Sequence, residues 1–138
     1  MANTISMQDM QHINLFGNTT RIRTRYCFDY NETIFFCVPK KLISKAIGEG
    51  GKNIRQMSTL LRKKIKVIPI PYGIQHAKEF IRAIVSPVLF KDLEIKDNEI
   101  ILTAGNQSKA ALIGRNKRRL LEMQKIIKDF FGKEFKII

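Results

Sequence analysis

Two kinds of hydrophobic pattern occur along the chain, and together they predict a mixture of helices and strands. Apolar residues that recur every three or four positions, such as Met7, Met10 and Ile13, are typical of a helix that buries one face. Alternating or continuous apolar residues over short stretches are typical of strands. These patterns predict helices over residues 4–16, 40–47, 52–63, 75–85, 106–113 and 117–131, and strands over residues 21–28, 33–38, 65–70, 89–95, 99–104 and 134–138.

Individual residues predict where some of these elements begin and end. Thr4 and Asn106 are expected to cap the helices that start at them. Gly17 and Gly132 are expected to end helices, because glycine readily adopts the left-handed conformation at a helix end. Pro69 indicates that the strand over residues 65–70 lies at a sheet edge or ends early.

The order of elements occurs twice, which predicts an internal repeat. At an offset of 66 residues, Ile47-Gly48 aligns with Ile113-Gly114, and Met57 aligns with Met123. The sequence therefore predicts an α+β protein with two domains, residues 1–70 and 71–138. Each domain is expected to have the order αββααβ, with a three-stranded sheet packed against helices.

The charge of the chain favours a polyanionic partner. The 138 residues include 25 Lys and Arg against 12 Asp and Glu, a net charge of +13. Residues 1–70 carry 12 basic and 4 acidic side chains, and residues 71–138 carry 13 and 8, so the excess belongs to both predicted domains. Nucleic acid is the first candidate partner and an anionic membrane surface the second. The polar start of the chain and the lack of a long apolar run predict a cytoplasmic protein with no membrane partner.

The residues that usually carry catalysis or bind metals are few and scattered. Cys27 and Cys37 cannot complete a four-ligand zinc site without histidine, and His12 and His76 lack metal-site spacing. No nucleophile triad, carboxylate pair or phosphate-binding loop of an ATPase is present. We therefore expect no enzyme activity, no cofactor and no metal. The two cysteines are expected to be free thiols, with one disulfide as the alternative.

A glycine-rich segment, Gly48-Glu49-Gly50-Gly51, separates two predicted helices. Glycine has no side chain to hold a nucleic-acid backbone away, so the two backbones can approach closely. The helix that follows directs free N–H groups and the positive end of its dipole toward the same place. The segment predicts a site that binds a sugar-phosphate strand, with contacts at Lys45, Ile47, Gly48, Glu49, Gly50, Gly51, Lys52, Asn53 and Arg55.

This segment resembles the G-x-x-G loop of KH domains, with an apolar residue before the loop and another three residues after it. KH domains clamp about four nucleotides of single strand, and the resemblance implies an apolar groove for the bases beside the loop. Nearly the whole chain resembles the archaeal NusA-like transcription factors, which contain two tandem KH domains of the prokaryotic type (type II). The residues that carry this likeness are Leu15-Phe16, Thr19, Cys27, residues 38–54 and residues 110–138.

The resemblance implies a function without catalysis. It implies a protein that binds single-stranded nascent RNA and acts in transcription elongation or termination, with RNA polymerase or other transcription factors as further partners. One alternative is a ribosomal-RNA-associated KH protein without a role in transcription. Another is a scaffold whose second domain binds a protein instead of RNA.

The two loops depart from the family pattern in different ways. In the first, the carboxylate of Glu49 opposes phosphate binding unless nearby cations offset it. In the second, lysine replaces the last glycine, and we expect Lys117 to begin a helix with ordinary helical φ. We therefore expect the first loop to bind by shape and the second by charge, with contacts at Gly114, Arg115, Asn116, Lys117, Arg118 and Arg119.

A further basic feature has two interpretations. Arg21, Arg23 and Arg25 alternate with less polar residues and form a stripe on one face of a predicted strand. The stripe is either a solvated sheet face or an additional track for phosphates. One or both of the phenylalanines Phe35 and Phe36 are expected in the core, with base stacking as the alternative.

Overall fold

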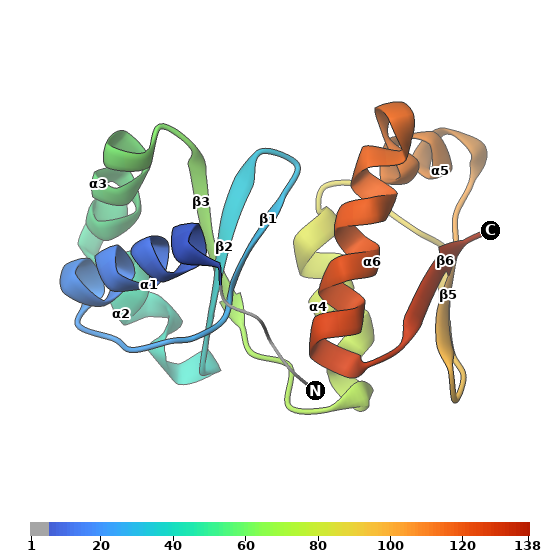
Figure 1. Cartoon of the computed structure of the whole chain (residues 1–138), viewed down its shortest axis with the longest axis horizontal. Coiled ribbons are helices and arrows are strands. Elements are labelled where there is room, and N and C mark those ends of the chain that lie inside the picture. The colour runs from blue at the N-terminus through green and yellow to red at the C-terminus, as the bar shows by residue number, and fades with distance from the viewer. Residues whose placement is uncertain (1–5) are drawn as a thin grey trace. The chain divides into compact units, whose positions relative to one another are not determined.

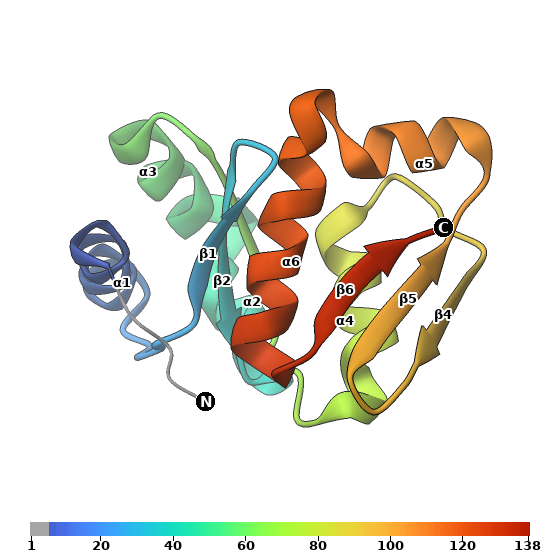
Figure 2. The same ribbon diagram turned by 45° about the vertical axis from the view of Figure 1, so that its right-hand side comes forward.

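Both halves of the chain form the same order of helices and strands. The computed structural model describes residues 6–138; the predicted cap Thr4 lies outside them. The described chain divides into two compact units, residues 6–70 and Pro71–Ile138. Each unit has the order αββααβ and one three-stranded sheet, which agrees with the predicted α+β class (Figures 1 and 2).

In the unit of residues 6–70, the sheet has β2 at its centre. Strand β1 pairs with β2 in the antiparallel sense, and β3 pairs with β2 in the parallel sense. Pro69 therefore lies on an edge strand, as predicted. The elements are α1 (Met7–Thr20), β1 (Cys27–Tyr30), β2 (Thr33–Val38), the 3₁₀ turn η1 (Lys40–Leu42), α2 (Ile43–Ile47), the 3₁₀ turn η2 (Glu49–Gly51), α3 (Lys52–Leu61) and β3 (Lys64–Pro69).

The core of this unit lies between β2 and the helices. All six residues of β2 are buried, as expected for the central strand of a covered sheet. The rings of Phe16 on α1 and Phe36 on β2 stack with their centroids 4.4 Å apart. The remaining buried members of this cluster are Ile22, Ile34, Val38, Ala46, Met57 and Ile65.

The unit Pro71–Ile138 repeats this topology around β5. Strand β4 is antiparallel to β5, and β6 is parallel to it. The ring of Phe80 on α4 packs against Phe130 and Phe131 at the end of α6. The elements are η3 (Ile74–His76), α4 (Ala77–Val85), β4 (Asp92–Ile95), β5 (Glu99–Thr103), α5 (Asn106–Ile113), η4 (Arg115–Lys117), α6 (Arg118–Phe131) and β6 (Glu134–Ile137).

Helix α1 continues past the glycine that was expected to end it. Ser6 caps its start by accepting a hydrogen bond from the Asp9 backbone N–H at 3.0 Å. The helix runs through Gly17 to Thr20, where the Thr20 hydroxyl donates to the Phe16 carbonyl at 2.8 Å. Arg21 then takes the left-handed conformation that ends the helix. The prediction of an end at Gly17 was wrong, because a helix can accommodate one glycine when hydrogen bonds continue beyond it.

The first strand is shorter than the predicted residues 21–28. Residues 22–26 form no ladder, although they run beside the end of β2. The Thr24 hydroxyl donates to the Cys37 carbonyl at 2.5 Å, and the Tyr26 carbonyl accepts a backbone bond from the Cys37 N–H at 3.0 Å. The side-chain bond takes the place of a ladder bond, so the regular strand starts at Cys27.

The predicted cap of α5 is also one residue away from the observed one. Gly105 occupies the N-cap position, and Asn106 is the first residue of the helix without a side-chain capping bond. The cap is Gly105 because its carbonyl already accepts a helical hydrogen bond, from the Lys109 N–H at 2.7 Å.

Both cysteines are free thiols. Cys27 lies opposite Phe36 in the β1–β2 register, so their side chains share one face of the sheet. Cys37 follows Phe36 on β2 and therefore points to the other face. Burial raises the pKa of the Cys37 thiol. Burial, followed by the nearby Asp9 carboxylate, raises the pKa of the Cys27 thiol. Both thiols are therefore uncharged near neutral pH.

Within residues 6–138, no helix combines the length and hydrophobicity needed to cross a bilayer.

Candidate nucleic-acid interface

The first glycine-rich loop joins α2 to α3 through backbone conformations that glycine favours. Gly48 has φ 83° and ψ 164°, a region that is almost restricted to glycine. Gly50 (φ 60°, ψ 21°) and Gly51 (φ 77°, ψ 19°) are both left-handed. The four residues therefore turn the chain sharply and leave the start of α3 without a side-chain cap.

Two of the glycines in this loop have very different surroundings. A Cβ on Gly48 would lie 2.9 Å from Cγ of Asn53, closer than side chains pack. A Cβ on Gly50 would meet no atom within 4 Å. Gly48 thus has an internal packing role, whereas Gly50 leaves open space at the surface, where another chain could approach.

Asn53 and Arg55, two of the predicted contacts, bind the loop itself. The Asn53 side-chain amide donates to the Lys45 carbonyl at 3.3 Å and connects α3 to α2. The Arg55 guanidinium donates to the Gly50 carbonyl. Both side chains hold the loop in position, and Arg55 places its charge beside the most exposed glycine.

The other predicted residues of this loop are close together around its rim. Lys45, Glu49 and Lys52 are exposed, while Ile47 is half-buried. Lys45 lies in the single turn of α2 and Lys52 begins α3, so both are held by helices on either side of the glycines. The loop has one carboxylate among three cationic side chains.

A groove adjoins this loop along α3 and β3. Its volume is about 440 Å³, and Arg55 belongs both to its wall and to the loop. The other lining residues are Thr33, Ile54, Ser58, Thr59, Lys64, Ile65 and Lys66. The groove therefore combines apolar side chains with hydroxyl groups and cations.

Lys64, Lys66 and the three hydroxyl residues of this groove were not among the predicted contacts. Lys64 and Lys66 alternate with the buried Ile65 on β3, a pattern that indicates an exposed basic strand face. That alternation was the signal available in the sequence. Its position beside α3 depends on the parallel pairing of β3 with β2, which the pattern does not specify.

The second loop has the same backbone as the first although it lacks two of the glycines. Gly114 (φ 76°, ψ 171°) matches Gly48, and Asn116 (φ 57°, ψ 29°) matches Gly50. Lys117 is left-handed (φ 60°, ψ 23°), not helical, and α6 begins at Arg118. The expectation that Lys117 begins the helix was wrong, because the turn requires positive φ at this position whatever residue occupies it.

The basic side chains of the second loop differ in their availability. Arg115, Asn116, Lys117 and Arg118 are exposed. Arg119 packs over Gly114, and its guanidinium forms an ion pair with Glu122 at 2.6 Å. Three exposed cations therefore surround the start of α6, which has no side-chain cap.

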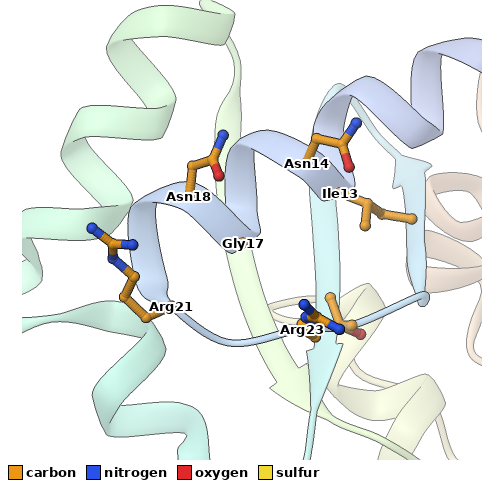
Figure 3. Close-up of a pocket in the computed structure, with 7 residues that line it drawn as sticks. Ile13, Asn14, Gly17, Asn18, Arg21 and Arg23 are labelled. Atoms are coloured by element: carbon orange, nitrogen blue, oxygen red, sulfur yellow. The ribbon is translucent and has the colours of Figure 1, made fainter.

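Two arginines of the predicted stripe line a separate hollow of the unit of residues 6–70. Figure 3 shows Arg21 at the end of α1 and Arg23 further along the segment that leaves it. The hollow has a volume of about 550 Å³, and its other lining residues are Ile13, Asn14, Gly17, Asn18 and Thr24. Arg25 does not line it. The phenylalanines of β2 are unavailable for base stacking, since Phe35 is 2% exposed and Phe36 is fully buried.

Comparisons with known proteins agree with this architecture. No protein-family model matches the chain. The fold is similar to that of a solved structure described as "Crystal structure of APE1850", with a TM-score of 0.66 and 21% sequence identity. The match covers 97% of this chain and 99% of that chain.

One curated relative is similar in sequence. The chain is 29% identical over 92 residues to a protein of Methanococcus vannielii described as "Probable transcription termination protein NusA". The match covers 67% of this chain and 51% of that protein, so it spans about half the relative's length. The chain is thus related in sequence to a NusA-like protein.

Proposed function

We propose that this protein binds single-stranded RNA through two tandem KH-type loops and acts as a NusA-like factor in transcription elongation or termination. We propose binding alone, without catalysis. The observation that carries the proposal is the open surface at Gly50, beside an uncapped helix start and between cationic side chains.

The first loop suits a phosphate in several ways. The uncapped N-terminus of α3 offers N–H groups and a positive dipole end. Lys45 and Lys52 add charge from both sides, and Arg55 adds charge beside Gly50. Because no atom fills the space above Gly50, a sugar-phosphate strand can approach the loop backbone directly.

The groove along α3 and β3 suits the bases of the same strand. Ile54 and Ile65 line the groove with apolar atoms, and the exposed Thr59 supplies a hydroxyl group for base edges. The Ser58 hydroxyl donates to the Lys63 carbonyl at 2.8 Å, so its oxygen is available to a base only as an acceptor. Single-stranded RNA exposes both faces and edges of its bases, whereas a duplex does not. The groove therefore favours single strands over duplexes.

The second loop contributes to binding mainly by charge. Its backbone repeats that of the first loop, but Asn116 and Lys117 project side chains where the first loop has glycine. These side chains keep a strand further away. Arg115, Lys117 and Arg118 then attract phosphates at longer range.

The role in transcription is supported by sequence similarity to a probable transcription termination protein. That similarity spans about half of the relative. RNA binding is therefore proposed from the geometry of the loops, and the role in transcription is proposed from the relative's name alone.

Binding of short labelled RNAs tests the RNA part. We expect the full chain to bind single-stranded RNA of about eight nucleotides more tightly than a duplex of the same sequence. The logarithm of affinity should fall with the logarithm of salt concentration, with a slope of about −0.7 for each neutralised phosphate. Equal binding of the duplex, or no dependence on salt, would contradict the proposal.

Capture from cell extract tests the transcriptional part. We expect the tagged chain to recover transcribing RNA polymerase together with nascent RNA, and to be absent from ribosomal subunits in sedimentation. Cosedimentation with ribosomal subunits and no recovery of polymerase would favour a ribosome-associated protein instead.

A further inference from the structure

Three side chains with different donor atoms meet where α1 passes the start of β1. The carboxylate of Asp9, the imidazole of His12 and the thiol of Cys27 have donor atoms that all lie within 4.8 Å of one another. The group belongs wholly to the unit of residues 6–70, and none of its members is part of the RNA-binding loop.

The fold explains why these residues come together. Asp9 and His12 are three residues apart on α1 and so share one face of the helix. Cys27 begins β1 and lies directly opposite Phe36, so both side chains point to the same face of the sheet. The ring of Phe36 stacks on Phe16 of α1, and Cys27 therefore faces the same helix.

The imidazole of His12 supplies an independent observation. His12 is 7% exposed, and its Nδ1 atom forms no hydrogen bond. A buried nitrogen without a partner opposes folding, and few are retained in native proteins. A metal ion bound to the imidazole would compensate for this loss.

We propose that Asp9, His12 and Cys27 bind one divalent transition-metal ion, with zinc as the best fit. Nitrogen, oxygen and sulfur donors together suit zinc, which binds cysteine, histidine and carboxylate ligands in tetrahedral geometry. Three protein ligands leave the fourth position to water, which can enter because Asp9 and Cys27 are only half-buried.

The ion would stabilise the fold by cross-linking α1 and β1. Binding forms a metal–sulfur bond, and the proton of the Cys27 thiol goes to solvent. The bound ion joins α1 to β1, which are otherwise connected by the irregular residues 22–26. Sequence spacing does not reveal the site, because Cys27 follows His12 only after the end of the helix and that irregular segment.

Cobalt and zinc titrations of the full chain test the proposal. Cobalt should bind in a 1:1 ratio and produce both a thiolate-to-cobalt charge-transfer band and the strong visible bands of tetrahedral cobalt. Zinc should displace the cobalt. Zinc at 100 times its dissociation constant should raise the melting temperature by roughly 10 °C or more.

Matched variants identify the ligands. Cys27→Ala and Asp9→Asn should abolish or strongly weaken the spectrum and the thermal shift. Cys37→Ala, which removes the other thiol, should retain both. If Cys27→Ala fails to fold, Asp9→Asn and the wild-type charge-transfer band decide.

Absence of a 1:1 cobalt complex, or a charge-transfer band that survives Cys27→Ala, would overturn the proposal. Neither result bears on RNA binding, because the ligands lie outside both loops.

Discussion

At the scale of single residues, the first loop separates a glycine needed for folding from a glycine available for binding. Gly48 has a backbone conformation almost restricted to glycine and closely contacts Asn53. Gly50 has a left-handed conformation that asparagine also adopts, and it faces open space. A substitution at either position would reduce RNA binding, but for different physical reasons.

Gly48→Ala should destabilise the unit of residues 6–70. The change forces alanine into a disfavoured backbone region and places its Cβ against Asn53, at a cost of about 1–3 kcal/mol. Chemical denaturation should show this loss. Gly17→Ala is the matched control, since Gly17 is helical and an added Cβ would lie 3.8 Å from the Ile22 carbonyl oxygen, an ordinary contact distance. Equal stability of Gly48→Ala and wild type would contradict the loop geometry.

Glu49→Arg should strengthen RNA binding. The second loop already carries Arg115 at the equivalent position, so the backbone accepts the side chain. Exchange of a carboxylate for a cation near phosphate should raise affinity by roughly five- to tenfold at low salt. Glu94→Arg on β4 changes the net charge equally and serves as control. Similar gains from both variants would show that only the net charge matters.

At the scale of elements, the repeated helix–loop–helix keeps one backbone with two different sequences. Gly48 corresponds to Gly114, and both have φ near 80° and extended ψ. At the third and fourth loop positions the first loop has Gly50 and Gly51, and the second has Asn116 and Lys117, all at positive φ. The second loop therefore retains the shape while it replaces open backbone by side chains.

Lys117→Gly should stabilise the unit Pro71–Ile138 by about 0.5–1 kcal/mol. Glycine removes the cost of a left-handed lysine, which exceeds the added entropy of the unfolded chain. Arg118→Gly is the control, because Arg118 has ordinary helical angles (φ −63°, ψ −44°) and glycine there should destabilise. Denaturation midpoints measure both. A loss of stability in Lys117→Gly would contradict the left-handed assignment.

Much of the element order could be predicted from the sequence, and the failures occur where local hydrogen bonds determine a boundary. The continuous apolar run of β2 and the periodic apolar positions of α3 predict their elements well. The end of α1 and the start of β1 depend on side-chain bonds of Thr20 and Thr24, which hydrophobic pattern does not encode.

The candidate site could be predicted in part. The glycines identify the first loop, since few other residues tolerate its backbone angles. The groove of Lys64 and Lys66 depends on which strands pair, and this is a long-range property. The inward roles of Asn53 and Arg119 depend on contacts across each loop, which spacing alone does not give.

At the scale of the whole molecule, positive charge and the repeated loop support the same kind of partner. The net charge of +13 is shared by both halves of the sequence, so each unit attracts a polyanion. In the proposed function, long-range attraction of RNA would depend on salt, whereas close contact at a loop would depend on shape. The two contributions can therefore be separated experimentally.

Fluorescence anisotropy with a short single-stranded RNA measures whether RNA approaches the backbone at Gly50 closely. Three proteins would be compared: one with Gly50, one with Gly50→Asn and one with Gly50→Asp. In all three, Arg115 and Arg118 would be replaced by alanine, so that the second loop contributes little to binding. Thermal melting would confirm that all three fold alike, as expected from the open space at Gly50 and from Asn116 in the second loop. We predict roughly tenfold weaker binding for Gly50→Asn, about 1.4 kcal/mol, and a larger loss for Gly50→Asp. Unchanged affinity in both folded variants would show that RNA does not contact the loop at Gly50.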